Sequence, residues 1–272
     1  MNFSVLMSVY VKENPFFLNE SLNSILVDQT VIPNEVVLIK DGPLTEELDK
    51  VISNFQVNHQ QLKVIALEKN VGLGEALSVG LESCSYDLVA RMDSDDISES
   101  NRFEKQINYF FNHPKCVLLG SNIKEFHETV SNFRLKKQPL TKEEIEKYSK
   151  FRNPFNHPSV MFKKKYIVNL EGYEHCPLFE DYLLWVKVIH SGAEVANLEE
   201  STVYMRASNG LYSRRGGYKY CLNILNFRNK CLKNGYINIF DYIKVVPIQL
   251  IMALMPGSIR EKIYVKVLRS EK

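Results

Sequence analysis

The fold is decided by four short apolar runs: Phe3–Tyr10 (FSVLMSVY), Glu35–Lys40 (EVVLIK), Leu62–Leu67 (LKVIAL) and Asp87–Met92 (DLVARM). Runs of this length and β-branched content are typical of buried strands. Apolar residues recur at helical spacing in the segments that follow them, which begin at Asn14-Pro15, Thr45, Leu73 and near Phe103. This alternation predicts an α/β fold, with a mostly parallel sheet flanked by helices. Ligands of such sheets bind beyond the carboxyl ends of the strands.

Size and composition exclude several classes of protein. The 272-residue chain carries a net charge of +2 and is 45% hydrophobic, whereas a dedicated nucleic-acid binder is usually far more basic. Its five cysteines form no C-x-x-C pair, which argues against a disulfide framework or a structural zinc site. No signal peptide is expected, because the apolar start lacks a basic region. The longest uncharged run, Val245–Ile259, is too short and too interrupted by proline to span a membrane, which excludes a processive synthase with its own channel.

Three carboxylates follow the fourth strand in Arg91–Asp96 (RMDSDD). Side chains alternate along extended backbone, so Asp93 and Asp95 are expected to point the same way. Two carboxylates on one side of a turn suit Mn²⁺ or Mg²⁺, which fill their remaining positions with phosphate oxygens and water. The alternative is a solvated acidic turn that precedes the next helix.

Two more polar turns follow the second and third strands. The first is Asp41-Gly42, and the second is Asn70–Gly74 (NVGLG), which opens a helix. Glycines at a helix N-terminus let a phosphate-bearing ligand approach the backbone, although each turn taken alone is an ordinary connection. The spacing is not G-x-G-x-x-G, so a dinucleotide cofactor is not expected. Three polar turns at successive strand ends favour a ligand site at this edge.

The second half of the chain carries further candidates. Glu180-Asp181 begins a helical segment and, as an isolated pair, is also typical of an acidic first turn. Arg214-Arg215 beside Gly216 either binds phosphate in bidentate fashion or is solvated charge. His157, in a proline-rich loop, either binds a ligand or has a structural role. Trp185 lies on the same helix face as Asp181 and is expected in the core.

In number and order, these segments resemble the family 2 inverting glycosyltransferases of the GT-A fold. The resemblance is to the bacterial O-antigen, capsule and exopolysaccharide type, including the amylovoran-biosynthesis subgroup. It spans nearly the whole chain, in the segments Ser4–Tyr10 with Glu13, Pro33–Pro43 (PNEVVLIKDGP), Asn70–Leu81 (NVGLGEALSVGL), Arg91–Asp96, His157–Phe162 (HPSVMF), Glu180-Asp181 and Arg206–Gly216 (RASNGLYSRRG). It implies a nucleotide-sugar-binding part at 1–127, an acceptor-binding and catalytic-base part at 128–216, and a C-terminal helical segment at 217–272.

The resemblance also implies roles for individual residues. Asp181 would be the general base, Asp95 would hold Mn²⁺ or Mg²⁺ on the diphosphate, and Asp41 would hydrogen-bond the uracil of a UDP-sugar. The donor-binding set would be Val9, Tyr10, Glu13, Asp41, Asn70, Gly72, Arg91, Asp93 and Ser94. The set that binds the acceptor and phosphates would be His157, Glu180, Arg214 and Arg215.

The implied reaction moves a hexose from a UDP-sugar to a polyprenyl-diphosphate-linked sugar. Family analogy favours UDP-glucose or UDP-galactose and a β-1,3 linkage. Inversion needs a base for the acceptor hydroxyl, and positive charge for the leaving diphosphate. A sugar-phosphate nucleotidyltransferase is one alternative. Such an enzyme needs a glycine-rich phosphate loop directly after the first strand, and Val9–Glu13 at that position contains no glycine. A non-catalytic sugar-binding relative is another, against which Asp93, Asp95 and Asp181 argue.

The C-terminal end mixes apolar residues with cations. Beyond Pro256 the cations are Arg260, Lys262, Lys266, Arg269 and Lys272. Basic amphipathic segments lie on anionic membrane surfaces, whereas the ordinary alternative is a packed helix pair. Because the family's acceptors are lipid-linked, the resemblance favours a cytoplasmic protein held peripherally at the inner face of the plasma membrane.

Overall fold

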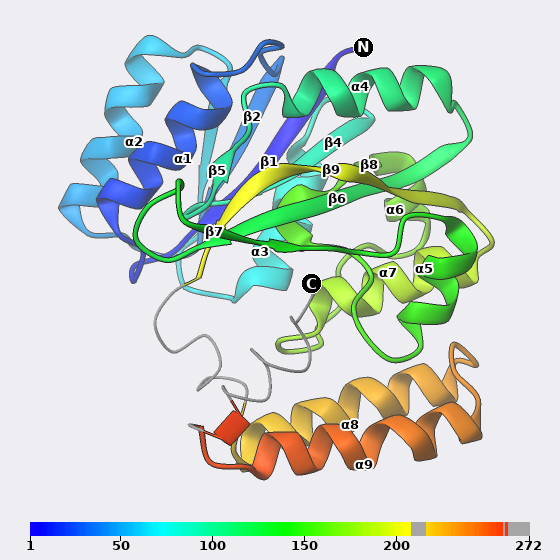
Figure 1. Cartoon of the computed structure of the whole chain (residues 1–272). Helices are drawn as coiled ribbons and strands as arrows, with labels where there is room; N and C mark the ends of the chain where they lie inside the picture. The colour runs from blue at the N-terminus through cyan, green and yellow to red at the C-terminus, as the bar shows by residue number, and fades with distance from the viewer. Residues whose placement is uncertain (208–215, 258, 261–272) are drawn as a thin grey trace.

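The computed structural model describes residues 1–207, 216–257 and 259–260, and it shows a mixed sheet covered by helices on both faces (Figure 1). The strands are β1 (Phe3–Val9), β2 (Glu35–Lys40), β3 (Leu62–Ala66), β4 (Leu88–Asp93), β5 (Ile97–Ser98), β6 (Cys116–Phe126), β7 (Phe133–Lys136), β8 (Met161–Lys163) and β9 (Glu194–Arg206). The helices are α1 (Pro15–Leu26), α2 (Glu46–Asn58), α3 (Leu73–Ser83), α4 (Arg102–Asn112), α5 (Lys142–Ser149), α6 (Lys164–Asn169), α7 (Glu180–His190), α8 (Tyr218–Lys233) and α9 (Ile239–Leu254).

The nine strands form one sheet in the order β3-β2-β1-β4-β8-β6-β9-β5, with β7 paired to β6. The first four strands along this order are parallel, as the sequence predicts. Beyond β4 the sheet is mixed, because β8 runs antiparallel to both β4 and β6 while β9 is parallel to β6. The α/β class, the parallel half and the flanking helices are therefore confirmed.

Local sequence explains where several helices begin. Asn14 caps α1 by accepting a hydrogen bond from the backbone N–H of Phe16 at 2.9 Å, and proline takes the first helical position. Thr45 caps α2 in the same way. Thr141 and Glu144 form a complete capping box at the start of α5. These polar side chains satisfy backbone N–H groups that have no partner inside the helix.

Two buried clusters fix the helices to the sheet. On one face, alternate residues of the parallel strands pack against α1, α2 and α4. On the other face, the intervening residues, such as Leu6, Val37 and Ile39, pack against α3 and α7. Trp185 is fully buried in this second cluster, which confirms its predicted place in the core. The parallel strands are thus buried on both sides, as near-continuous apolar runs require.

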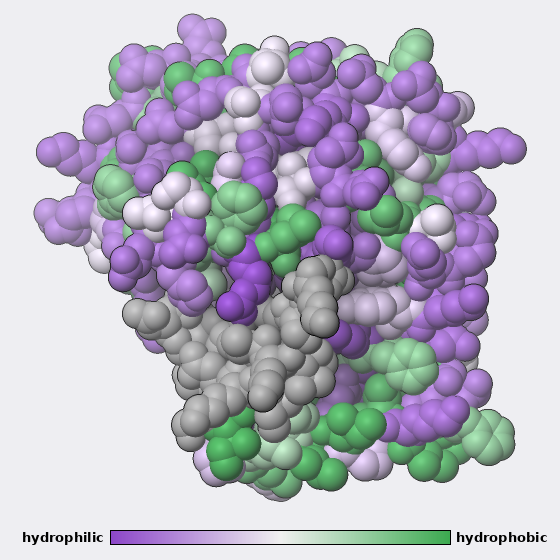
Figure 2. Space-filling view, in the orientation of Figure 1, coloured by the Kyte–Doolittle hydropathy of each residue, from purple (hydrophilic) through white to green (hydrophobic). Residues whose placement is uncertain are grey.

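The helix α7 lies between two layers. A third cluster joins its outer face, through Leu183 and Val186, to residues of α8 and α9 that include Phe227. The two long C-terminal helices form a hairpin below the sheet in Figure 1. In the same orientation, Figure 2 shows hydrophobic side chains gathered along this lower edge. None of the described helices combines the length and apolar content that crossing a bilayer demands.

The middle of the chain differs from expectation. The sequence pattern does not reveal β6, and the basic stretch from Arg134 forms part of β7. Residues His157–Ser159 form a short 3₁₀ turn that leads into β8. The long strand β9 and the short β8 flank β6 in the sheet. Strands from both sides of residue 127 belong to one sheet, so the expected boundary there does not separate two sheets.

Candidate active site

The parallel strands deliver several polar residues to one cavity. In the sheet, Ser8 lies opposite Asp93 and Val9 lies opposite Lys40, so the turns after β1, β2 and β4 sit side by side. They border a cavity of about 1000 Å³. Eight of the predicted donor-side and metal residues line it: Tyr10, Glu13, Asp41, Asn70, Gly72, Asp93, Ser94 and Asp95. Val9 is buried just behind, and its carbonyl accepts a hydrogen bond from the Asp41 N–H.

Asp41 organises the loop between β3 and α3. Its carboxylate accepts hydrogen bonds from the backbone N–H groups of Val71 (2.7 Å) and Gly72 (3.1 Å) and from the Asn70 amide (2.9 Å). Gly42 has φ +85°, and a Cβ there would lie 2.6 Å from the Asn70 nitrogen. Glycine is therefore required for this close approach. Three of about four carboxylate lone-pair positions are occupied, which leaves one for a ligand.

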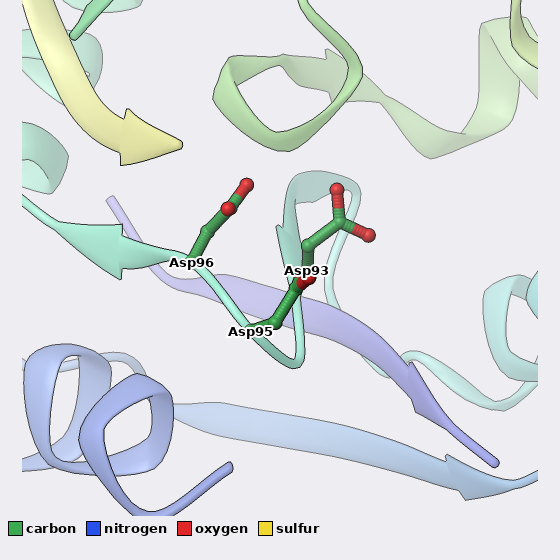
Figure 3. Close-up of side chains that lie close together, drawn as sticks. All are labelled: Asp93, Asp95 and Asp96. Carbon is green, nitrogen blue, oxygen red and sulfur yellow. The ribbon is translucent and has the colours of Figure 1, made fainter. Parts of the chain in front are cut away.

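The acidic loop after β4 contributes Asp93 and Asp95 to the cavity, with Asp96 close to them (Figure 3). The carboxylates of Asp93, Asp95 and Asp96 offer ligand atoms that all lie within 4.8 Å of one another. Asp93 forms an ion pair with the buried guanidinium of Arg91. Ser94 donates a 2.5 Å hydrogen bond to Glu13, which ties the loop to the segment after β1.

The electrostatics of this loop fit a divalent cation. Burial, Asp93 and Glu13 raise the pKa of Asp95 to about 7. Burial and the other two acids raise the pKa of Asp96 well above the ordinary aspartate value. One oxygen of Asp96 has no hydrogen-bond partner among the described residues. A hard cation prefers such oxygen ligands and would relieve the repulsion between them.

Arg206 holds this loop in place, although no individual role was predicted for it. Its backbone N–H donates to Asp96 at 2.8 Å, and its guanidinium donates to the Asp95 carbonyl at 3.1 Å. The same guanidinium pairs with Glu20 at 2.7 Å and stacks 3.8 Å from the ring centroid of Phe17. The sequence feature that could have identified Arg206 is its position at the end of a strand, because ligand sites lie at strand ends.

The predicted base lies apart from this cavity, at the start of α7. The Asn153 amide donates to one oxygen of Asp181 at 2.7 Å, and the Tyr182 N–H donates to the other at 2.7 Å. Burial raises the pKa of Asp181, while these two hydrogen bonds lower it partway. Burial and the neighbouring Asp181 raise the pKa of Glu180 as well. Glu180 packs against Gly74 of α3, where an added Cβ would lie 2.7 Å from its Cγ.

Arg91 connects the two acidic regions. It is 1% exposed, and two of its nitrogens, Nε and Nη1, have no hydrogen-bond partner in the described part of the chain. Its charge lowers the pKa of Asp181 and, after burial, that of His157. His157 is therefore neutral, and it lies 3.0 Å from the Tyr173 hydroxyl. Buried unsatisfied donors are costly, so Arg91 is suited to a ligand oxygen.

Several residues that were not predicted line the cavity or contact Asp181. Arg214 and Arg215 lie outside the described residues. The sequence reasoning missed Asn153, because its contact with Asp181 joins a loop to a helix 28 residues away. It also missed the cavity-lining residues Ser8, Lys12, Asn14, Phe17, Leu73, His127, Glu128, Arg206 and Ala207.

The sequence is similar to known sugar-transferring proteins. Residues 4–169 match the profile of glycosyl transferase family 2. The UDP-Gal:alpha-D-GlcNAc-diphosphoundecaprenol beta-1,3-galactosyltransferase of Escherichia coli is 40% identical over 267 residues, which cover 98% of this chain and 96% of that protein. The amylovoran biosynthesis glycosyltransferase AmsE of Erwinia amylovora is 38% identical over 267 residues, with 97% and 98% covered.

Solved structures share the fold. S. aureus TarS 1–349 in complex with UDP-GlcNAc superposes with a TM-score of 0.66 at 18% identity, over 98% of this chain and 72% of that one. The mannosyltransferase PcManGT from Pyrobaculum calidifontis, in complex with GDP-Man and Mn²⁺, gives a TM-score of 0.66 at 12% identity, over 98% and 75%. These likenesses confirm the GT-A-like architecture that the sequence predicts.

The acidic loop predicts a pH-dependent response to metal. Because the folded-state pKa of Asp95 is raised to about 7, the metal-free protein loses stability as pH rises from the ordinary aspartate range through 7. Mn²⁺ offsets this repulsion. At about 100 times its Kd it should add about 2.7 kcal/mol of stability, or roughly 5–10 °C in Tm at pH 8. The increment should be smaller at pH 5, where protons compete. Thermal unfolding with Mn²⁺ and with EDTA measures both.

The matched variant is Asp95→Asn. It should be more stable than the wild type without metal at pH 8, because one buried charge is gone, and its Tm should not respond to Mn²⁺. An equal Mn²⁺ increment in the variant and the wild type would show that the loop is not the metal site.

Proposed function

This chain belongs to glycosyl transferase family 2, and we propose that it is an inverting, metal-dependent hexosyltransferase. The proposed donor is a UDP-sugar, and the proposed acceptor is a polyprenyl-diphosphate-linked sugar. The observation that supports this best is the acidic loop at Asp93, Asp95 and Asp96, which borders a cavity of about 1000 Å³ beside the Asp41 turn. That volume suits a nucleotide sugar, and the acids suit the cation that accompanies a diphosphate.

The donor cavity divides into a base-binding side and a diphosphate side. On the first, the remaining acceptor position of Asp41 would take the uracil N–H, on a floor made by the backbone at Val9 and Tyr10. On the second, Asp95 would hold Mn²⁺ or Mg²⁺, with Asp93 directed to the ribose or sugar. When bound, the cation would supply positive charge to the leaving diphosphate. Arg91 has N–H groups left for an oxygen of the donor.

Asp181 would act as the general base. It would take the proton of the acceptor hydroxyl while the hydroxyl oxygen attacks the anomeric carbon. The bond from that carbon to the diphosphate breaks as the glycosidic bond forms, so the configuration inverts and UDP leaves. Burial gives Asp181 a raised pKa, which strengthens it as a base once it is ionised. Asn153 would keep the carboxylate oriented.

The relatives favour one donor over the others. The Escherichia coli relative carries UDP-Gal, GlcNAc-diphosphoundecaprenol and a β-1,3 linkage in its name, and it covers nearly the whole chain. We therefore propose UDP-galactose as the donor, a β-1,3 linkage and a GlcNAc-diphosphate-lipid as the acceptor. The AmsE relative supports a place in the synthesis of a bacterial polysaccharide.

A donor panel tests the reaction. The purified protein is incubated with UDP-galactose, UDP-glucose, UDP-N-acetylglucosamine, UDP-N-acetylgalactosamine or GDP-mannose and a GlcNAc-diphosphate-lipid, in Mn²⁺ or in EDTA. Mass spectrometry should show one added hexose from UDP-galactose in Mn²⁺ only, removable by a β-galactosidase. Asp181→Asn should bind UDP like the wild type and lose about 10²–10⁴ in kcat, because the proton acceptor is gone.

Two results would oppose the proposal. Absence of transfer from every donor would contradict the activity, and near-normal turnover by Asp181→Asn would remove that residue from the role of base.

The contact between Asn153 and Asp181 predicts a shift in the pH profile. The Asn153 hydrogen bond lowers the pKa of Asp181, so Asn153→Ala should raise that pKa. Because the base must be ionised, the acid limb of kcat/KM should move to higher pH, and activity should recover at alkaline pH. Initial rates of wild type and variant across pH 4.5–9 measure this (roughly the range around a raised aspartate pKa). A loss that is equal at every pH would instead indicate a purely structural role.

We further propose that the α8–α9 hairpin rests on the membrane surface. On α9, Phe240, Ile243, Ile251 and Leu254 share a face and are 57–71% exposed. Contiguous exposed apolar faces mark interaction sites, and a lipid-linked acceptor lies at a bilayer. Lys244, exposed beside them, suits anionic lipid.

Vesicle binding tests this contact. The wild type should co-sediment with vesicles of phosphatidylethanolamine and phosphatidylglycerol. The double variant Phe240→Ser/Ile243→Ser should lose most of this binding and keep its Tm. The matched control is Val57→Ser, on an 83% exposed residue of α2, and it should sediment like the wild type. Equal sedimentation of all three proteins would rule out the hairpin as the contact.

A further inference from the structure

A second groove opens beside Asp181, and it shares no lining residue with the donor cavity. It has a volume of about 490 Å³ and lies between the start of α7 and the α8–α9 hairpin. Its polar residues include Asp181, Asn153 and Arg152. Most of its remaining wall is apolar or aromatic, from Phe179, Ile224, Ile248 and Met252 among others. One end of the groove therefore reaches the proposed base, and the rest of it suits a ligand with little polarity.

The two most exposed apolar side chains of the groove are Ile248 and Leu178. Ile248 on α9 is 63% exposed, and Leu178, just before α7, is 60% exposed. Leu178 also has φ +70°, a left-handed conformation that costs a non-glycine residue about 1–2 kcal/mol. The backbone thus holds a large apolar side chain over the groove at a conformational cost. Exposed leucine and isoleucine on one groove favour a hydrocarbon ligand over a free saccharide.

The positive charge of Arg152 indicates that the hydrocarbon ligand also carries an anionic group. Arg152 is exposed, lies next to Asn153 in sequence, and contacts the ring of Tyr148, with its guanidinium carbon 5.8 Å from the ring centroid. A guanidinium pairs well with phosphate oxygens, in a bidentate manner where geometry allows. The groove therefore combines a cation, a carboxylate that can accept a proton, and a long apolar wall.

We propose that this groove binds the lipid side of the acceptor, with isoprene units nearest the diphosphate lying along Ile248 and Met252. Arg152 would pair with the diphosphate, and the sugar would reach Asp181. This inference rests on the proposed function, because it assumes an acceptor that is an isoprenoid diphosphate sugar. It adds that the enzyme recognises the lipid itself, in addition to the sugar and the diphosphate. Such an acceptor presents a sugar, a diphosphate and a hydrocarbon chain, and the groove presents a carboxylate, a cation and apolar side chains.

A binding experiment separates this inference from catalysis. The probe is farnesyl diphosphate, which carries isoprene units and a diphosphate but no sugar. Calorimetry is performed with saturating UDP and Mn²⁺, so that the donor cavity is filled. The wild type should bind the probe, and Ile248→Ser should weaken it about tenfold, the order of effect of apolar contacts removed from a pocket. Arg152→Gln should weaken the binding of farnesyl diphosphate but not that of farnesol, which lacks the diphosphate. The matched control, Leu222→Ser on an exposed α8 residue that does not line the groove, should bind like the wild type.

A kinetic experiment uses acceptors that differ only in the lipid. With GlcNAc-diphosphate acceptors in detergent, the wild type should show a lower KM for a polyprenyl chain than for a short alkyl chain. In Ile248→Ser that preference should shrink about tenfold, while UDP binding and Tm stay at wild-type values. The groove assignment would be overturned if the wild type did not bind farnesyl diphosphate, or if its KM were equal for the polyprenyl and the alkyl acceptor. Either result would count even if sugar transfer occurs. If the variants change probe binding as predicted but no sugar transfer occurs, the groove assignment is supported and the proposed reaction is contradicted.

Discussion

The site depends on the parallel register of β1, β2 and β4. Each strand is buried on both faces, so its position is fixed by packing against α1, α2 and α4 on one side and α3 and α7 on the other. A slip of one residue would exchange the two sets of buried side chains, which makes the register strongly specified. The register places Ser8 opposite Asp93 and Val9 opposite Lys40. Tyr10, Asp41 and the acidic loop therefore lie close together because of the strand pairing, and no attraction between them is needed. This matters because the acids repel one another, and the packed core holds the strand ends together against that repulsion.

Buried cations balance part of that repulsion. Arg91 pairs with Asp93, and Arg102 donates a 2.6 Å hydrogen bond to the Arg91 carbonyl from beneath the strand end. Burial and the charge of Arg91 lower the pKa of Arg102 to about 9, so this second guanidinium remains charged near neutral pH. One carboxylate is thus paired, while Asp95 and Asp96 keep raised pKa values. The loop is therefore stable enough to fold around its acids and still retains affinity for an added cation.

Much of this arrangement could be predicted from sequence, for a physical reason. The parallel strands are apolar runs, their helices have capping residues, and the polar turns follow the strands directly, so local pattern and spacing were sufficient. The strands β6 to β9 were harder, because β6 pairs with both β8 and β9, segments far along the chain that carry no strict alternation. Asn153 and Arg206 were missed for a related reason. Each matters through a partner distant in sequence, Asp181 for one and Asp95 and Asp96 for the other. Asp93, by contrast, stands in the short motif Arg91–Asp96. Asp181 was singled out through the family resemblance, because Glu180-Asp181 alone is also typical of an acidic first turn.

On the proposed function, a water-soluble donor and a lipid-linked acceptor must meet in one protein, and the packing of α7 offers a physical basis for this. Trp185 fixes one face of α7 to the sheet, and Leu183 and Val186 fix the other to the hairpin. The start of this helix therefore cannot move relative to either layer without loss of buried contacts. Asp181 stands there and lines the apolar groove, while the charge of Arg91, on the strand that leads to the donor cavity, lowers its pKa. A polar surface can bind a nucleotide diphosphate, and an apolar one can bind a hydrocarbon chain, but neither can do both. On the proposed function, the base belongs at the boundary between these two surfaces, and a helix packed on both sides is a rigid way to hold it there.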